Sequence, residues 1–233
     1  IHNPVRAHGD GPSGDVAFGG MYFAHKYPER RAQMDLLLGA AVDVSPRMEH
    51  GLEIFSRFQG GDERYQFPEP FGSRVVGSLD YDRMLTAYRE YKVFLNVNSV
   101  VDSPSMCARR VFEITACGTP VVTTPSAAIR EFFPPDEVFV VGERAEAAHT
   151  IRALVRSREL RDRATHRGQR RIWREHTYGA RVQRVLHDVG LAGLATVARP
   201  SVSALVSTNR PGPLAPVLRT VGAQRDADVQ LAL

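Results

Sequence analysis

Two arginines and a glutamate stand close together in the chain, at Arg109, Arg110 and Glu113. Guanidinium groups bind phosphate oxygens through charge-assisted hydrogen bonds, whereas a carboxylate accepts hydrogen bonds from hydroxyl groups. A nucleotide offers both kinds of group, since its diphosphate is anionic and its ribose carries hydroxyls. These residue types at this spacing therefore mark the segment as a candidate nucleotide site.

The residues just upstream predict a helix whose first turn could bind an anion. Ser103 is a helix-capping residue, and Pro104 suits a first turn because its missing N–H needs no partner there. The free N–H groups and the positive dipole end of such a helix would face the carboxyl edge of a sheet, where phosphates are favoured. We therefore expect a diphosphate at Ser105, Met106 and Cys107.

The far end of this helix is predicted at Cys117, because Gly118 followed by Pro120 is a common helix termination. Glu113 lies eight residues after Ser105, which is about 12 Å along a helix axis. This span suits a carboxylate that accepts two ribose hydroxyls while the helix start holds the phosphates.

An ordinary ion pair is the alternative role for Glu113. Arg109 precedes it by four residues and Arg110 by three. These are the spacings of pairs on a solvated helix face, which contribute a few tenths of a kcal/mol. Spacing alone leaves both roles open.

Strands and helices are predicted to alternate along the chain. The apolar, β-branched runs at residues 15–20, 52–56, 93–99, 121–124 and 137–142 are predicted strands, and Val75, Val76 and Gly77 form a further short element. The predicted helices cover residues 28–42, 80–91, 144–156, 158–175 and 177–189. Such a βα series predicts an α/β, doubly wound and mainly parallel Rossmann-like sheet.

Further candidate ligand residues follow predicted strands and so belong at the same carboxyl edge. Gly20 closes a glycine pair that lets a ligand approach the backbone, and His25 and Lys26 follow in the next loop. Arg57 ends one strand, and Asn98 lies near the end of another. Arg30 and Arg31 follow near the same edge, where these cations could meet diphosphate oxygens. Lys26 and Arg30 could equally be ordinary solvent-facing residues of a helix start, and both interpretations stay open.

Composition excludes several classes of protein. The chain has 233 residues, of which 43% are hydrophobic, enough for one full α/β domain and a fragment. No apolar run approaches the roughly 18 residues that span a bilayer, and no signal peptide is visible, so we expect a cytoplasmic protein. The two cysteines, Cys107 and Cys117, would lie about 15 Å apart on one helix, beyond disulfide reach.

The positive charge admits a second interpretation. The net charge is +4 and the isoelectric point is about 9.3, mostly through arginines spread over helices. A basic surface is one sign of nucleic-acid binding, but acidic residues alternate with these arginines, as on a solvated helix face. We therefore expect no nucleic acid. No phosphate-binding glycine loop is visible, and no zinc-ligand spacing or other metal motif is visible either.

The chain is predicted to contain two domains. Residues 1–14 resemble a linker that follows a missing N-terminal domain, and residues 15–190 form the first domain. Residues 191–200 are a second predicted linker, and residues 201–233 begin something new, with strands at 202–206 and 228–233 around a helix at 214–224.

A family resemblance adds to these inferences. The segment from Arg110 to Val122 resembles the Glu-Ala-x-Ala-Cys-Gly-x-Pro-Val-Val motif of GT-B-fold glycosyltransferases, most closely the spore-protein CgeB-like branch. The resemblance covers about residues 15–190 and implies the donor-binding half of such an enzyme, with Glu113 on the donor ribose. Ser105 departs from the pattern, because the wider retaining families carry a second glutamate there.

Residues 201–233 resemble the first βαβ unit of a family 2, GT-A-fold glycosyltransferase. That resemblance implies that Thr208 and Asn209 lie near the nucleotide base. The Asp-x-Asp metal motif of that family would follow Leu233, so a divalent metal is expected only for this truncated domain and no cofactor for the first. A generic Rossmann-like βαβ unit is the alternative.

The resemblance implies that the whole protein transfers a sugar from a UDP-, GDP- or TDP-linked donor to a hydroxyl of a glycan or other acceptor. Acceptor binding and any catalytic base would belong to the missing N-terminal half, so this chain is expected to bind nucleotide but turn over little. Two alternatives stay open: a sugar-nucleotide epimerase of GT-B architecture and a noncatalytic binding module.

Overall fold

The computed structural model describes residues 12–22, 28–194, 201–205, 214–224 and 228–232. Its contacts divide the chain into two compact units, Ile1–Arg181 and Val182–Leu233, and each is described by itself. The predicted linkers at residues 1–14 and 191–200 lie largely outside the described residues, and the predicted domain boundaries stay predictions.

The first unit is built on one six-stranded sheet in the order β3-β2-β1-β4-β5-β6. Every pairing of neighbouring strands is parallel. The strands are β1 (Gly14–Gly20), β2 (Leu52–Ser56), β3 (Val75–Gly77), β4 (Tyr91–Asn96), β5 (Val121–Thr123) and β6 (Phe139–Val140). The α/β, Rossmann-like fold class predicted from the alternating elements is therefore confirmed. Because the strand order reverses between β1 and β4, a crevice is expected at their carboxyl ends.

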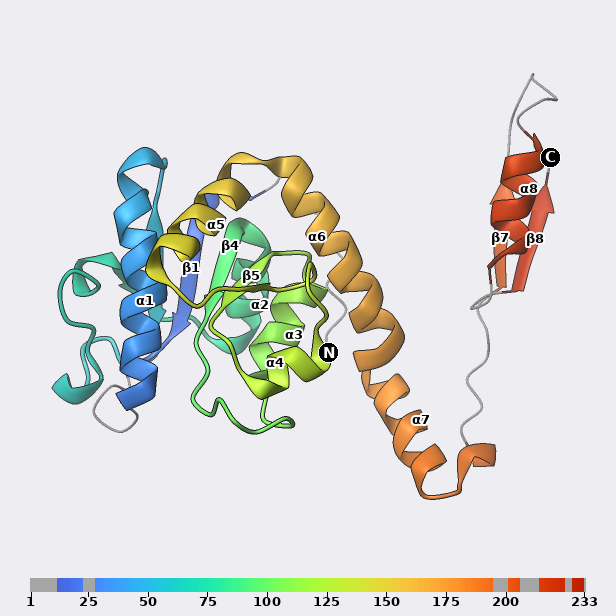
Figure 1. The fold of residues 1–233 in the computed structure, drawn as a ribbon, viewed down its shortest axis with the longest axis horizontal. Helices are drawn as coiled ribbons and strands as arrows, with labels where there is room; N and C mark the ends of the chain where they lie inside the picture. Colours follow the sequence, from blue (N-terminus) through green and yellow to red (C-terminus); the bar gives the residue numbers. More distant parts are fainter. Residues whose placement is uncertain (1–11, 23–27, 195–200, 206–213, 225–227, 233) are drawn as a thin grey trace. The chain divides into compact units, whose positions relative to one another are not determined.

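Helices cover both faces of this sheet (Figure 1). Residues of α1 (Pro28–Val44) and α5 (Arg144–Arg156) share one buried cluster with β1, β2 and β4. Residues of α2 (Tyr81–Glu90), α3 (Arg109–Ala116) and α4 (Ala127–Phe132) belong to the cluster on the other face. α6 (Arg158–Arg171) continues into a π-helical turn, Ile172–His176, and α7 (Tyr178–Asp188) crosses the boundary between the two units.

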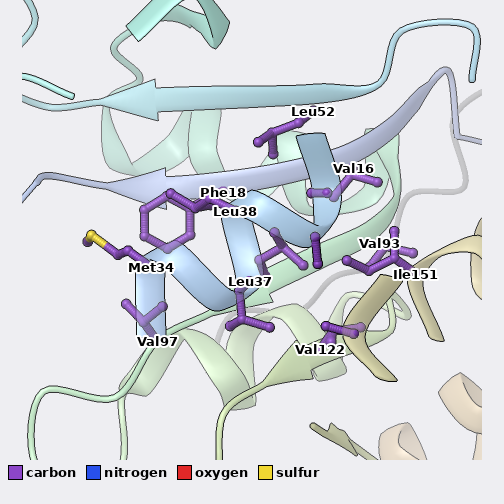
Figure 2. Packing of buried hydrophobic residues seen from close by; sticks show 14 of the residues in the cluster. Val16, Phe18, Met34, Leu37, Leu38, Leu52, Val93, Val97, Val122 and Ile151 are labelled. Carbon is purple, nitrogen blue, oxygen red and sulfur yellow. The ribbon is translucent and has the colours of Figure 1, made fainter. Parts of the chain in front are cut away.

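The core explains why these segments take their places. Figure 2 shows Phe18 of β1 beside Met34 and Leu37 of α1, with Leu52 of the neighbouring strand close by. All four side chains are fully or almost fully buried. β1 and β4 read as near-continuous apolar runs because both faces of a central parallel strand are covered by helices.

The helix predicted from Pro104 begins later, and that prediction is wrong. The Ser103 hydroxyl does accept the Met106 N–H at 3.2 Å, as a helix cap would. The turn is not propagated, because Ala108 has extended backbone angles (φ −62°, ψ 124°) and α3 starts at Arg109. The 12 Å separation expected between Ser105 and Glu113 along one helix therefore does not apply.

Other boundaries shift slightly. β4 ends at Asn96, three residues earlier than predicted, and the run at 137–142 is strand only at Phe139–Val140. The short helix α4 was not predicted, because six residues carry too little periodicity. It is capped by the Ser126 hydroxyl, which accepts the Ile129 N–H at 3.2 Å.

The second unit contains a parallel βαβ arrangement. β7 (Ser201–Leu205) pairs with β8 (Asp228–Ala232), and α8 (Leu214–Gly222) lies between them in the chain. The two strands and the helix agree with the sequence prediction to within two residues. Among the described residues, no helix has the length and apolar character needed to cross a membrane.

Candidate functional site

A cavity of about 630 Å³ opens at the carboxyl edge of the sheet. It is lined by the ends of β1 and β2, the loop before α2, and the first turns of α2 and α3. β1 and β4 are the two strands between which the strand order reverses. This carboxyl-edge cavity thus occupies the place where open α/β sheets bind ligands.

Glu113 is the buried carboxylate of the cavity. It lies on the second turn of α3, and its side chain is only 6% exposed. The Tyr81 hydroxyl donates to Glu113 Oε1 at 2.7 Å, and Arg109 Nε meets the same oxygen at 2.7 Å. Both described contacts fall on Oε1, so the carboxylate is oriented by one oxygen while Oε2 is left for another donor.

The partners of Glu113 also contact each other. The Arg109 guanidinium stacks over the Tyr81 ring, 4.9 Å from its centroid. Burial, followed by the hydrogen bond to Glu113, raises the pKa of the Tyr81 phenol to about 12. Tyr81 therefore remains a protonated hydrogen-bond donor across the physiological pH range.

Further guanidinium groups line the same cavity as Glu113. Arg110 donates to the carbonyl oxygen of Gly19 and lies over the Phe18 ring, 5.9 Å from its centroid. Burial lowers the pKa of Arg110, but an arginine stays protonated. Arg57 and Arg30 line the same cavity, so its wall combines one buried carboxylate with several cationic groups.

The start of α3 adds backbone donors to this cationic wall. Its N-cap, Ala108, has no side chain that could accept a hydrogen bond from the first turn, and Ala108, Arg109 and Arg110 all line the cavity. The N-terminal N–H groups of a helix and its dipole favour an anion. The arrangement can hold an anionic group at this end and a hydroxyl-bearing group at Glu113.

The structure brings five of the predicted site residues together at this cavity: Gly20, Arg57, Arg109, Arg110 and Glu113. Ser105, Met106 and Cys107 lie in the loop before α3 and do not line the cavity, because the helix starts at Arg109. His25, Lys26, Thr208 and Asn209 lie outside the described residues.

Asn98 lies in a buried polar network rather than in the cavity wall. Its Nδ2 donates to the Thr124 carbonyl oxygen at 2.8 Å, and its backbone N–H donates to Gln33 Oε1 at 2.6 Å. Gln33 Nε2 returns a hydrogen bond to the Asn98 carbonyl at 2.8 Å. These bonds tie α1 to the loops that follow β4 and β5.

Sequence reasoning missed Tyr81 and Tyr88 as cavity residues, whereas Arg30, expected near the carboxyl edge, does line the cavity. Tyr81 is separated from Glu113 by 32 residues, so no local spacing relates the two. A usable signal was present nonetheless: Asp80 caps α2 after the short strand β3, which places the first residue of α2 at the carboxyl edge. Burial raises the pKa of Tyr88 to about 12.

Open parallel α/β sheets bind ligands at the switch point in the strand order, and the cationic cavity lies there. The model of a glycosyl transferase-like family matches residues 39–187, most of the chain and all of α2 and α3. The chain therefore belongs to this glycosyl transferase-like family. No curated protein matches the chain.

Solved structures share the fold. The C-terminal domain of the glycosyl transferase group 1 family protein LpcC from Francisella tularensis aligns with 13% identity and a TM-score of 0.52, over 72% of this chain and 88% of that one. Sucrose-phosphate synthase from Thermosynechococcus elongatus aligns with 16% identity and a TM-score of 0.53, over 79% and 47%.

A TarM variant from S. aureus, in complex with Fondaparinux, alpha-GlcNAc-glycerol and UDP, aligns with 13% identity and a TM-score of 0.53 over 80% of this chain. The chain spans only 38% of TarM and 47% of the sucrose-phosphate synthase. At these identities the likenesses establish the fold alone.

Proposed function

We propose that residues 15–190 form the donor-binding half of a GT-B glycosyltransferase of the CgeB-like branch. The observation that carries the proposal is Glu113, a buried carboxylate held on one oxygen by Tyr81 and Arg109 at a cationic cavity. Its other oxygen would accept the ribose hydroxyls of a nucleotide-sugar donor. The membership of the glycosyl transferase-like family supports this assignment.

The diphosphate of the donor would lie at the start of α3, against the cavity arginines. When the sugar leaves, negative charge develops on the outer phosphate of the nucleotide diphosphate. Fixed guanidinium groups and helix N–H groups stabilise such charge without reorganising, which is electrostatic catalysis. Arg57 and Arg110 are the groups proposed to do this, together with the N–H groups of the first turn of α3.

The acceptor would be a hydroxyl of a glycan or a similar molecule, bound largely by a second half that this chain lacks. UDP in the TarM complex supports a nucleoside diphosphate as the ligand of the family fold. The chain by itself would then bind the donor while transferring sugar slowly.

The βαβ arrangement of β7, α8 and β8 supports a further part of the proposal. We infer that it begins a GT-A-like nucleotide-binding domain, in which Thr208 and Asn209 would lie near the base and a divalent metal would be bound by later residues. No cofactor is proposed for the first domain.

Calorimetric titration of the chain with UDP, GDP and TDP, and with their sugar conjugates, tests the donor site. We expect one of these nucleotides to bind with a dissociation constant of about 1 mM or tighter, and the others more weakly. A folded chain that binds none of them would contradict the proposal. Epimerised donor formed without any acceptor would instead favour the epimerase alternative.

Replacing Tyr81 by phenylalanine should weaken donor binding without abolishing it. Tyr81→Phe keeps the ring beneath Arg109 but removes the hydroxyl that orients Glu113, a hydrogen bond to a charged group. We expect about a tenfold rise in the dissociation constant, since such bonds contribute about 1.5 kcal/mol or more. Tyr178→Phe, a change at an exposed tyrosine outside the cavity, is the matched control and should leave affinity unchanged.

A further inference from the structure

A second cavity, of about 560 Å³, lies at the opposite edge of the same sheet. Its wall includes Tyr91 and Lys92, the first residues of β4, and Thr119 and Pro120, which immediately precede β5. In a parallel sheet the amino ends of all strands lie at one edge. This amino-edge cavity is therefore separate from the carboxyl-edge cavity that contains Glu113.

The wall of the amino-edge cavity is strongly basic. Four cationic side chains line it, Arg89, Lys92, Arg158 and Arg161, and the only lining carboxylate among the described residues is Asp162. α6 contributes Arg158 and Arg161 from one helix face, since they are spaced by three residues. Even counting Asp15, which lies behind Lys92, the cations exceed the carboxylates by two.

The contacts of Lys92, Arg158 and Arg161 show how far the positive charge of these three side chains is offset. Lys92 Nζ meets Asp15 Oδ1 at 2.7 Å, which offsets one cation. The Arg158–Asp162 pair is 3.4 Å long and both side chains are mostly exposed, so it holds Arg158 weakly. Arg161 donates to the neutral carbonyl oxygens of Leu154 and Val155 at the end of α5, which does not cancel its charge.

The turn between α3 and β5, residues 117–120, also lines the cavity and adds no negative charge. Gly118 has a positive φ of 82° and donates to the Thr115 carbonyl, and Thr119 N–H donates to the Ile114 carbonyl. Gln169 Nε2 donates to the Ala116 carbonyl at 3.1 Å. The last carbonyl groups of α3 are thus already satisfied, so they do not repel an anion as strongly as free helix-end carbonyls would.

We propose that the amino-edge cavity binds a phosphorylated small molecule, independently of the nucleotide-sugar site. Several guanidinium groups around one polar cavity match the geometry and charge of phosphate oxygens. The volume falls in the range of small-molecule sites and is ample for a pyrophosphate or a sugar phosphate.

Titration of the full chain with inorganic pyrophosphate, followed by backbone amide NMR shifts, tests this site. We expect Lys92, Gly118, Thr119 and Thr165 amides to shift in parallel with one dissociation constant. Arg158→Glu should raise that constant about tenfold, because a charge-assisted contact becomes repulsive. The change is mild for folding, since a glutamate suits the first residue of a helix.

Arg163→Glu is the matched control, because Arg163 lies exposed on the same helix outside the cavity wall. It should change the constant by no more than about twofold. Equal losses in both variants would reveal general charge attraction and overturn the site. Shifts confined to Gly19, Gly20 and Arg110, or none at ~10 mM pyrophosphate, would also overturn it. If a single-stranded oligonucleotide bound more tightly and displaced pyrophosphate, the ligand of this cavity would be nucleic acid. That result would also overturn the proposal of a small-molecule ligand.

Discussion

Glu113→Gln is expected to abolish most of the nucleotide affinity of this chain, raising the dissociation constant about a hundredfold. The substitution keeps the size of the side chain but removes the charge. Two ribose hydroxyls would lose a charged acceptor, and each hydrogen bond to a charged group contributes about 1.5 to 3 kcal/mol. The amide also presents a donor NH₂ group where the ribose needs an acceptor.

Calorimetric titration of the variant with the nucleotide that the wild type prefers would measure this effect. Glu131→Gln is the matched control, because Glu131 is exposed on α4 and does not line the cavity. A far-ultraviolet circular dichroism spectrum identical to that of the wild type would show that Glu113→Gln folds. Unchanged affinity in a folded variant would mean that Glu113 only pairs with Arg109 and Tyr81, which is the structural role left open by its spacing.

Asp15→Ala is expected to lower the free energy of unfolding by about 3 kcal/mol. Asp15 is the second residue of β1 and is 1% exposed. Its carboxylate accepts the N–H groups of His50 at 2.8 Å and Gly51 at 3.1 Å, as well as Lys92 Nζ at 2.7 Å. Removing it leaves two backbone donors and a partly buried ammonium group without their partner.

Urea denaturation of both proteins near neutral pH would measure the loss. Asp43→Ala is a suitable control, because Asp43 pairs with Arg144 at 2.7 Å but both side chains are about half exposed. That pair should contribute less than about 1 kcal/mol, since solvent screens it. Equal losses in the two variants would contradict the importance of the buried carboxylate.

The effect of Asp15 should depend on pH. Burial raises the pKa of Asp15, but the hydrogen bonds from Lys92, His50 and Gly51 outweigh burial and hold the pKa below its usual 3.8. A carboxyl group with a lowered pKa stabilises the folded state above its unfolded pKa and loses this contribution as pH falls through the folded pKa. The difference between wild type and Asp15→Ala should therefore shrink below about pH 4. A difference that stays constant down to pH ~3 would contradict this assignment.

The sequence by itself determined the architecture. The β-branched segment Val121–Thr123 is a fully buried strand because both faces of the sheet are covered by helices. The alternation of such segments with helical periodicity leaves few arrangements other than a parallel, doubly wound sheet. The motif around Glu113 also identified the helix that carries the site, since Gly118 and Pro120 mark its end.

Only the tertiary structure decided which residues meet at the cavity. Ser103 and Pro104 carry the local signals of a helix start, yet the loop after β4 extends through Ala108 before α3 begins, so Ser105 to Cys107 fall outside the cavity wall. Tyr81 comes to Glu113 from another helix, across 32 residues of chain. Local propensities act over a few residues, whereas the contacts of Glu113 depend on how two helices pack on one face of the sheet, and packing is set by the whole core.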